Sequence, residues 1–285
     1  MYFRGHNYDV HLSVTIVMMK ILNGSELAGF IKERQARQVR GLRQAHGIAP
    51  KLSIIVTQDH PAIATYVRMK SKYGADVGVD TEIHRIKQES ARELIAQLNH
   101  DSSVHGVIVQ LPLENPVETD EICDLVTPEK DVDALGEKAT YEPATPMAIM
   151  WLLAGYNVDL AGKKIVLVGR GKLVGRPLEK LLRAANLDVE TIDKNTSNTA
   201  EIIKEADVIV TATGSNGVIT SEMIKPNAVV VDAGVAGEEG RTVGDLAADV
   251  RERADLTITP EKGGVGPLTI CALFDNVIRA ARETI

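Results

Sequence analysis

Short apolar segments alternate with amphipathic segments along most of this chain. Apolar runs bounded by polar residues are typical of strands buried in a parallel sheet, and apolar positions at helical spacing are typical of the helices that cover it. The predicted strands span 51–57, 81–87, 105–111, 163–169, 187–193, 207–213 and 228–234. The predicted helices span 62–77, 90–100, 147–156, 174–185 and 267–284. This alternation predicts an α/β protein.

A polar, proline-containing stretch at 129–146 interrupts the alternation and predicts two lobes. We expect a first α/β lobe formed by residues 19–146, to which a C-terminal helix within 268–285 returns. Residues 147–267 are expected to form a second, Rossmann-like lobe with a parallel sheet. Residues 1–18 are expected to be a poorly ordered extension, because their apolar part is short, broken by polar residues and followed by no small-residue cleavage site.

Composition excludes several classes of function. A net charge of −7 over 285 residues argues against a nucleic-acid-binding surface, which needs clustered positive charge. Cys123 and Cys271 form no CxxC motif, so we expect neither a metal site nor a disulfide, and we expect a reducing, cytoplasmic compartment. No apolar run reaches the length of a membrane span, and no membrane association is expected.

A glycine-rich turn joins the strand at 163–169 to the helix at 174–185. Glycines at such a turn let a phosphate approach the backbone, and the following helix offers free N–H groups and a positive dipole end. The spacing here is GxGxxxG, one residue longer than the usual dinucleotide fingerprint. The residues expected to bind a dinucleotide are Gly169, Arg170, Gly171, Val174, Gly175, Asp193, Lys194 and Thr213.

The sequence gives mixed indications about which dinucleotide binds. Asp193 lies at the end of the next strand, where an acidic residue favours the free 2′-hydroxyl of NAD. Arg170 and Lys194 favour the 2′-phosphate of NADP. From these residues alone both cofactors stay open.

Tyr66 and Lys70 are four residues apart in the helix at 62–77 and therefore project from the same face. Alone, such a pair is usually a half-buried ring beside a solvated amine. Its interest comes from the other segments of unusual composition, which are VQLPL at 109–113, KDVDAL at 130–135 and GGVGPLT at 263–269. Together they suggest a cleft in which a flat substrate lies on Tyr66 with Lys70 at its reacting atom.

From about Lys20 to the C-terminus, these segments resemble the bifunctional methylenetetrahydrofolate dehydrogenase/methenyltetrahydrofolate cyclohydrolase family. Any one of the matching motifs is weak, but their shared order makes coincidence a poor explanation. They are PAxxxYVxxK at 61–70, VQLPL at 109–113, KDVD at 130–133, TP at 145–146, GRxxxVGxP at 169–177 and TPxxGGVGPxT at 259–269.

The resemblance implies oxidation of 5,10-methylenetetrahydrofolate with NADP and hydrolysis of the methenyl product to 10-formyltetrahydrofolate. It implies that Lys70 is the central catalytic residue, that Tyr66 stacks on the folate, that Gln110 holds Lys70 and that Asp133 binds the pterin edge. The further substrate-binding residues that it implies are Val109, Leu111, Pro112, Gly264 and Pro267. It also implies a cytoplasmic homodimer that associates through the second lobes.

Several positions depart from the family pattern and leave two alternatives. Asp193 motivates a monofunctional, NAD-dependent dehydrogenase. Ile63, which replaces a serine and removes a hydroxyl near the folate, motivates a non-catalytic folate- or nucleotide-binding protein, as does Glu261. The other departures are Gln58, Ala134, Ala144, Gly171, Lys194 and Lys262. Because all four implied catalytic residues are present, we favour the bifunctional enzyme.

Overall fold

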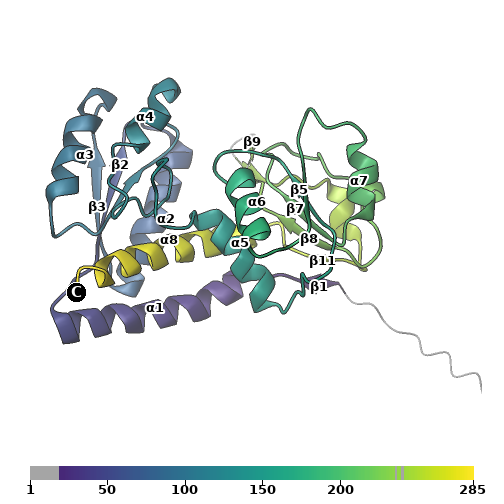
Figure 1. Ribbon diagram of the computed structural model, residues 1–285, viewed down its shortest axis with the longest axis horizontal. Coiled ribbons are helices and arrows are strands. Elements are labelled where there is room, and N and C mark those ends of the chain that lie inside the picture. Colours follow the sequence, from purple (N-terminus) through teal and green to yellow (C-terminus); the bar gives the residue numbers. More distant parts are fainter. Residues whose placement is uncertain (1–18, 235, 239–240) are drawn as a thin grey trace, which may run out of the picture.

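The computed structural model describes residues 19–234, 236–238 and 241–285 and contains two parallel sheets in two lobes (Figure 1). The predicted α/β class is confirmed, and each predicted strand and helix is present with slightly different bounds. The extension predicted at 1–18 lies outside the described residues.

The first lobe contains a sheet in the order β3-β2-β4, with all strands parallel. Its strands are β2 (Lys51–Val56), β3 (Asp80–Arg85) and β4 (Gly106–Val109). Its helices are α2 (Pro61–Val77), α3 (Ala91–His100) and α4 (Thr119–Cys123), with 3₁₀ turns at Gln88–Ser90 and Pro116–Glu118.

The second lobe contains a parallel sheet in the order β1-β11-β8-β7-β5-β6. Its strands are β1 (Lys20–Ile21), β5 (Ile165–Val168), β6 (Val189–Ile192), β7 (Val208–Thr211), β8 (Val229–Asp232) and β11 (Thr257–Ile258). The antiparallel pair β9 (Ala236–Glu238) and β10 (Arg241–Val243) is separate from it. The remaining elements are α6 (Gly175–Ala184), α7 (Thr199–Glu205) and 3₁₀ turns at Ser221–Met223 and Ala248–Glu252.

Three helices connect the lobes: α1 (Gly24–His46), α5 (Ala144–Gly155) and α8 (Val265–Arg282). Figure 1 shows α1 and α8 side by side along the base of the molecule, and α8 packs against both α1 and α5. The N-terminal half of α8 contributes Leu268 to the core of the second lobe, and its C-terminal half contributes Phe274 to the core of the first. One helix therefore belongs to both cores.

The division of the chain into lobes stays a prediction, with one difference at its start. Residues 20–21 fall in the range assigned to the first lobe, but β1 pairs with β11 in the second sheet. The long helix α1 follows β1 at once, with Asn23 as its N-cap, because the Asn23 side chain accepts the Glu26 N–H.

Candidate active site

The first part of the candidate site lies on α2. Pro61 occupies the first turn of this helix, and the His60 ring accepts the Ala62 N–H at 3.2 Å, so the helix start is fixed at its first residues. From this helix Tyr66 and Lys70 project on one face, as their spacing predicts.

Lys70 reaches across to the segment that follows β4. Its Nζ donates a hydrogen bond to Oε1 of Gln110 at 3.0 Å. The Gln110 amide nitrogen in turn donates to the Leu111 carbonyl at 2.9 Å, which orients the amide oxygen towards Lys70. Removal from water lowers the pKa of Lys70, and the nearby Asp133 carboxylate partly opposes this shift. The amine is thereby held in one position and made easier to deprotonate.

Tyr66 keeps its ring accessible beside this amine. The residue is 39% exposed, although it is a large aromatic side chain. Partial burial raises the pKa of its phenol, so the hydroxyl is protonated at neutral pH. An exposed, uncharged ring next to a fixed amine offers a flat surface for a conjugated ligand.

The two aspartates of the KDVD motif have different surroundings. Asp131 is buried and forms an isolated β-bridge with Val107 of β4. Its carboxylate accepts the N–H groups of Leu135 at 3.3 Å and Gly136 at 2.8 Å, which fixes the loop that follows the motif. Asp133 is only partly buried, and its charge acts on Lys70. Asp131 therefore shapes the loop, and Asp133 is the carboxylate available to a ligand.

Ala134, directly after this motif, has φ +56°, in the left-handed region that favours glycine. We expect Ala134→Gly to raise the free energy of unfolding by about 0.5 kcal/mol, because relief of the backbone strain outweighs the loss of a methyl packed on the first-lobe core. Urea unfolding measures this change. Ala75→Gly, at an exposed position in the last turn of α2, is the matched control and should lower stability by about 0.5 kcal/mol. Equal destabilisation by both substitutions would contradict the interpretation.

The other predicted substrate-binding residues differ in how far they are buried and in the elements that carry them. Val109 is 3% exposed and packs in a core cluster of the first lobe, whereas Pro112 is exposed. Gly264 immediately precedes α8, and Pro267 lies in its first turn. The Ser25 N–H donates to the Gly263 carbonyl at 2.9 Å, so the GGVGP loop is held against the start of α1.

Ile63 is a departure from the family pattern that lies on the same helix as Tyr66 and Lys70. Ile63 is 2% exposed and belongs to the first-lobe core with Val67. Ile63 is one turn before Tyr66 and two turns before Lys70, so it lies on the same side of α2 as these residues, but it is buried where Tyr66 is exposed. The exchange of serine for isoleucine therefore adds an apolar side chain to the first-lobe core directly beside the Tyr66–Lys70 face, and the loss of a hydroxyl near the folate stays a prediction.

Gln58, which departs from the family pattern, supports the segment after β4, and the sequence did not predict this contact. Its amide nitrogen donates to the carbonyls of Pro112 at 2.8 Å and Leu113 at 3.1 Å. The segment that carries Gln110 is thus braced from the loop between β2 and α2. The sequence shows Gln58 as an unusual residue after the buried strand β2, but only the fold shows that it contacts Pro112 and Leu113.

The glycine-rich turn lies at the carboxyl end of β5. Gly169 has φ +106°, and a Cβ built on it would lie 2.5 Å from the Ala212 carbonyl oxygen. A Cβ on Gly175 would lie 2.1 Å from the Gly169 carbonyl oxygen, whereas Gly171 has free space. The turn is packed too tightly for side chains at its two ends, and α6 begins directly behind it. This is the cradle that a dinucleotide phosphate requires.

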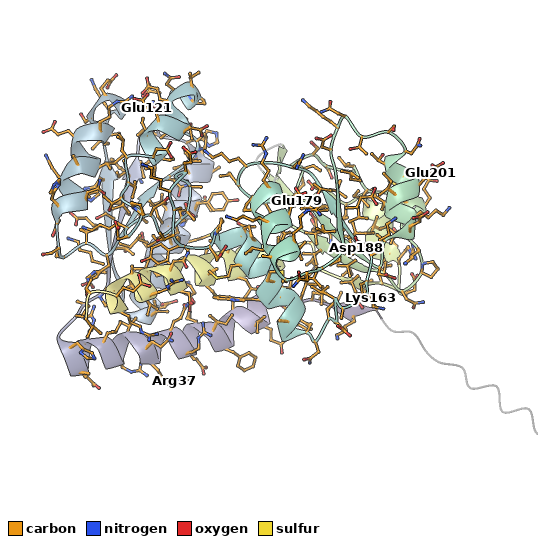
Figure 2. All side chains as sticks on the ribbon, in the orientation of Figure 1. Arg37, Glu121, Lys163, Glu179, Asp188 and Glu201 are labelled. Carbon is orange, nitrogen blue, oxygen red and sulfur yellow. The ribbon has the colours of Figure 1, made fainter. Side chains whose placement is uncertain are left out.

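Charged side chains surround this turn. Nε of Arg170 lies 3.2 Å from Glu179, which Figure 2 labels on α6, the helix of the second lobe that is nearest to the first in this view. Nζ of Lys172 lies 2.5 Å from Asp120 on α4, an exposed ion pair between the lobes that contributes little stability. Val174 is the residue before α6.

The end of β6 carries the residues that bear on cofactor choice. Oδ1 of Asp193 accepts the Asn195 N–H at 2.9 Å, and Lys194 is exposed beside it. Thr213 follows β7, and its N–H donates to the Asp245 carboxylate at 2.7 Å. Among the residues that the structure describes, no group of three or more side chains is arranged to hold a metal ion, and no helix has the length and apolarity to span a membrane.

Comparison with known proteins gives consistent results for both lobes. Residues 22–133 match the family description "Tetrahydrofolate dehydrogenase/cyclohydrolase, catalytic domain", and residues 143–285 match its NAD(P)-binding domain. The chain is 35% identical over 280 residues to "Bifunctional protein FolD" of Staphylococcus epidermidis, covering 93% of this chain and 98% of the relative.

Two solved structures share the fold. The bifunctional FolD enzyme of Campylobacter jejuni superposes with a TM-score of 0.87 at 34% identity, covering 94% of this chain and 100% of the other. The Trypanosoma brucei dehydrogenase-cyclohydrolase, solved with NADP and an inhibitor, gives 0.87 at 29% identity, covering 94% and 98%.

Proposed function

The chain belongs to the tetrahydrofolate dehydrogenase/cyclohydrolase family, and we propose that it oxidises 5,10-methylenetetrahydrofolate with NADP and hydrolyses the resulting 5,10-methenyltetrahydrofolate to 10-formyltetrahydrofolate. The observation that carries the proposal is the hydrogen bond between Lys70 and Gln110, with Asp133 close enough to act on the amine. This pair lies on the first lobe, and the glycine turn lies on the second.

For the oxidation, the residues act mainly by positioning. When bound, NADP would supply the hydride acceptor for the methylene carbon. Tyr66 offers the face on which the folate ring rests, and Asp133 accepts hydrogen bonds from its polar edge. Gly169 and Gly175 leave the backbone free to approach the phosphates. Holding two reactants in contact in this way supplies much of the rate of such a transfer.

For the hydrolysis, Lys70 supplies proton transfer. Water adds to the methenyl carbon and a proton must leave it, while a ring nitrogen must gain one before the ring opens. An amine with a lowered pKa gives up its proton more readily than a solvated lysine does, and Gln110 keeps Nζ in place for both transfers. A permanently protonated guanidinium in place of Lys70 lacks this ability.

The absorbance of the methenyl species tests the proposal. Purified protein with methylenetetrahydrofolate should form it faster with NADP than with NAD, and added methenyltetrahydrofolate should decay faster than its spontaneous rate without any nucleotide. A strong preference for NAD with no hydrolysis would favour the monofunctional alternative. Folate binding without either activity would favour a non-catalytic protein, which the intact Lys70–Gln110 pair does not favour.

Asp193 is the residue that motivates the NAD alternative. Because its carboxylate repels a 2′-phosphate, Asp193→Ser should raise the ratio of kcat/KM for NADP to that for NAD about tenfold. Steady-state kinetics with both nucleotides measures the ratio. Asp188→Ser removes the same charge just before the start of β6, at an exposed residue labelled in Figure 2, and should leave the ratio unchanged. A ratio that is the same in both variants would show that Asp193 does not face the ribose.

The proposal includes a cytoplasmic homodimer that associates through the second lobes. The two cysteines, Cys123 and Cys271, are free and buried, in keeping with a reducing compartment. Sedimentation equilibrium of the purified chain tests the oligomeric state.

A further inference from the structure

Two buried carboxylates lie together at the carboxyl ends of β7 and β8, outside the residues assigned so far. Asp232 ends β8, and Asp245 is completely buried. The Asp232 carboxylate accepts the Asp245 N–H at 3.0 Å, so the two residues are in direct contact. Among the described residues, Asp245 has no ion pair, although a buried carboxylate without a counterion is costly. The burial of this carboxyl group therefore calls for an explanation.

Asp245 fixes one segment of backbone with both of its oxygens. Oδ2 accepts the Thr213 N–H at 2.7 Å, and Oδ1 accepts the Ser215 N–H at 3.1 Å. A Cβ built on Gly234 would lie 2.0 Å from Oδ1, so glycine is needed to admit the carboxylate, which has little room to shift. An asparagine could accept only one of these bonds, and its NH₂ group would face the other N–H.

The segment that Asp245 holds forms a wall of the nucleotide turn. A Cβ built on Gly169 would lie 2.5 Å from the Ala212 carbonyl oxygen and 3.1 Å from the Thr213 nitrogen. The backbone of Thr213 is therefore packed against the first glycine of the phosphate cradle. A displacement of Thr213 displaces the surface that receives the dinucleotide.

Asp232 connects the same cluster to the substrate loop. It forms an ion pair with Arg251 at 2.9 Å, and the Arg251 guanidinium also donates to the Thr259 carbonyl at 2.9 Å. A Cβ built on Gly264 would lie 3.1 Å from Cβ of Thr259, so Thr259 packs against the GGVGP loop. The cluster thus contacts the supports of both halves of the cleft.

We propose that Asp245 is a positioning residue for the dinucleotide, holding residues 213–215 against the glycine turn, while the Asp232–Arg251 pair holds the loop before α8. The Asp245 carboxylate holds the N–H groups of Thr213 and Ser215, and hydrogen bonds to a carboxylate are stronger than those between neutral groups. This inference rests on the proposed function, because it assumes that NADP binds at the turn.

The bifunctional activity provides an internal control for the test. In Asp245→Asn we expect the KM for NADP to rise about tenfold, since a shift of the wall by a fraction of an ångström weakens the fit. Hydrolysis of added methenyltetrahydrofolate, measured without nucleotide, should stay within about twofold of the unsubstituted protein, since Asp245 does not touch the Lys70 site. Isothermal titration with NADP should show the same weakening of binding.

A matched control removes the same charge from another loop cap in this lobe. Asp249 is exposed and accepts the Ser221 N–H at 3.1 Å, and Asp249→Asn should leave both KM and hydrolysis unchanged. Gly234→Ala tests Asp245 without removing its charge, because the added Cβ displaces the carboxylate, and it should also raise the KM.

Three outcomes overturn the inference. They are an unchanged KM for NADP in folded Asp245→Asn, a fall of both activities in proportion to a fall in melting temperature, and an unchanged KM in Gly234→Ala should Asp245→Asn fail to fold. Failure of the proposed function would look different, because the unsubstituted protein would then show no NADP-dependent oxidation at all.

Discussion

Lys70→Met should lower the rate of methenyltetrahydrofolate hydrolysis about a thousandfold, while the protein still folds. Methionine has a similar length but cannot accept or donate the protons that ring opening requires. The substitution removes the hydrogen bond to Gln110 but leaves that amide able to bind water, so the cost in stability is small. The decay of methenyl absorbance measures the rate, and circular dichroism checks the fold.

Two further variants sharpen this prediction. Lys72→Met removes an exposed amine two residues along the same helix and should leave hydrolysis unchanged. Lys70→Arg keeps a positive charge that does not titrate near neutral pH, so it should be nearly as inactive as Lys70→Met. Full hydrolysis in Lys70→Arg would mean that a fixed charge, and not proton transfer, is what the reaction needs.

Gly175→Ala should lower NADP-dependent oxidation about a hundredfold and leave nucleotide-free hydrolysis nearly unchanged. The new Cβ would lie 2.1 Å from the Gly169 carbonyl oxygen, so the turn must open by about an ångström before the protein can fold. The phosphates then lose their fit with the backbone, whereas Lys70 lies in the other lobe. Oxidation kinetics and hydrolysis kinetics on the same preparation measure the two effects.

The control for this substitution is Gly41→Ala, at an exposed position of α1 where the added methyl meets no atom. Both activities should then equal those of the unsubstituted protein. If Gly175→Ala oxidised its substrate normally, the turn would be more pliable than its packing indicates, and the phosphate cradle would have to be sought elsewhere.

Periodicity predicted the strands whose burial is simple and missed the long helix α1, whose burial is mixed. The strand expected at 51–57 is β2 (Lys51–Val56), all but one of whose residues are buried. Helix α1 was not predicted, because most of its surface is polar and Gln35, a polar residue, is fully buried on its inner face. The amide of Gln35 bonds to the Cys271 carbonyl at 2.8 Å, a partner far away in the sequence.

In the candidate site too, some contacts could be predicted from the sequence and others depend on the fold. The pairing of Lys70 with Gln110 was expected from the family resemblance, and the fold brings these two side chains together. The position of Ile63 could have been read from its spacing to Val67, which marks the buried face of α2. Asp245 carries no local signal, because its two N–H partners are about thirty residues earlier and only the arrangement of β7 and β8 brings them close.

The hydrogen bond between Ser25 and Gly263 connects the first turn of α1 to the GGVGP loop. Gly24 adds to this contact, since a Cβ on it would lie 1.8 Å from the Gly264 carbonyl oxygen. A shortened protein that begins after this turn would keep every catalytic side chain and lose the fastening of its substrate loop. An affinity tag is therefore better placed at the C-terminus, where Ile285 is 67% exposed, than next to the first turn of α1.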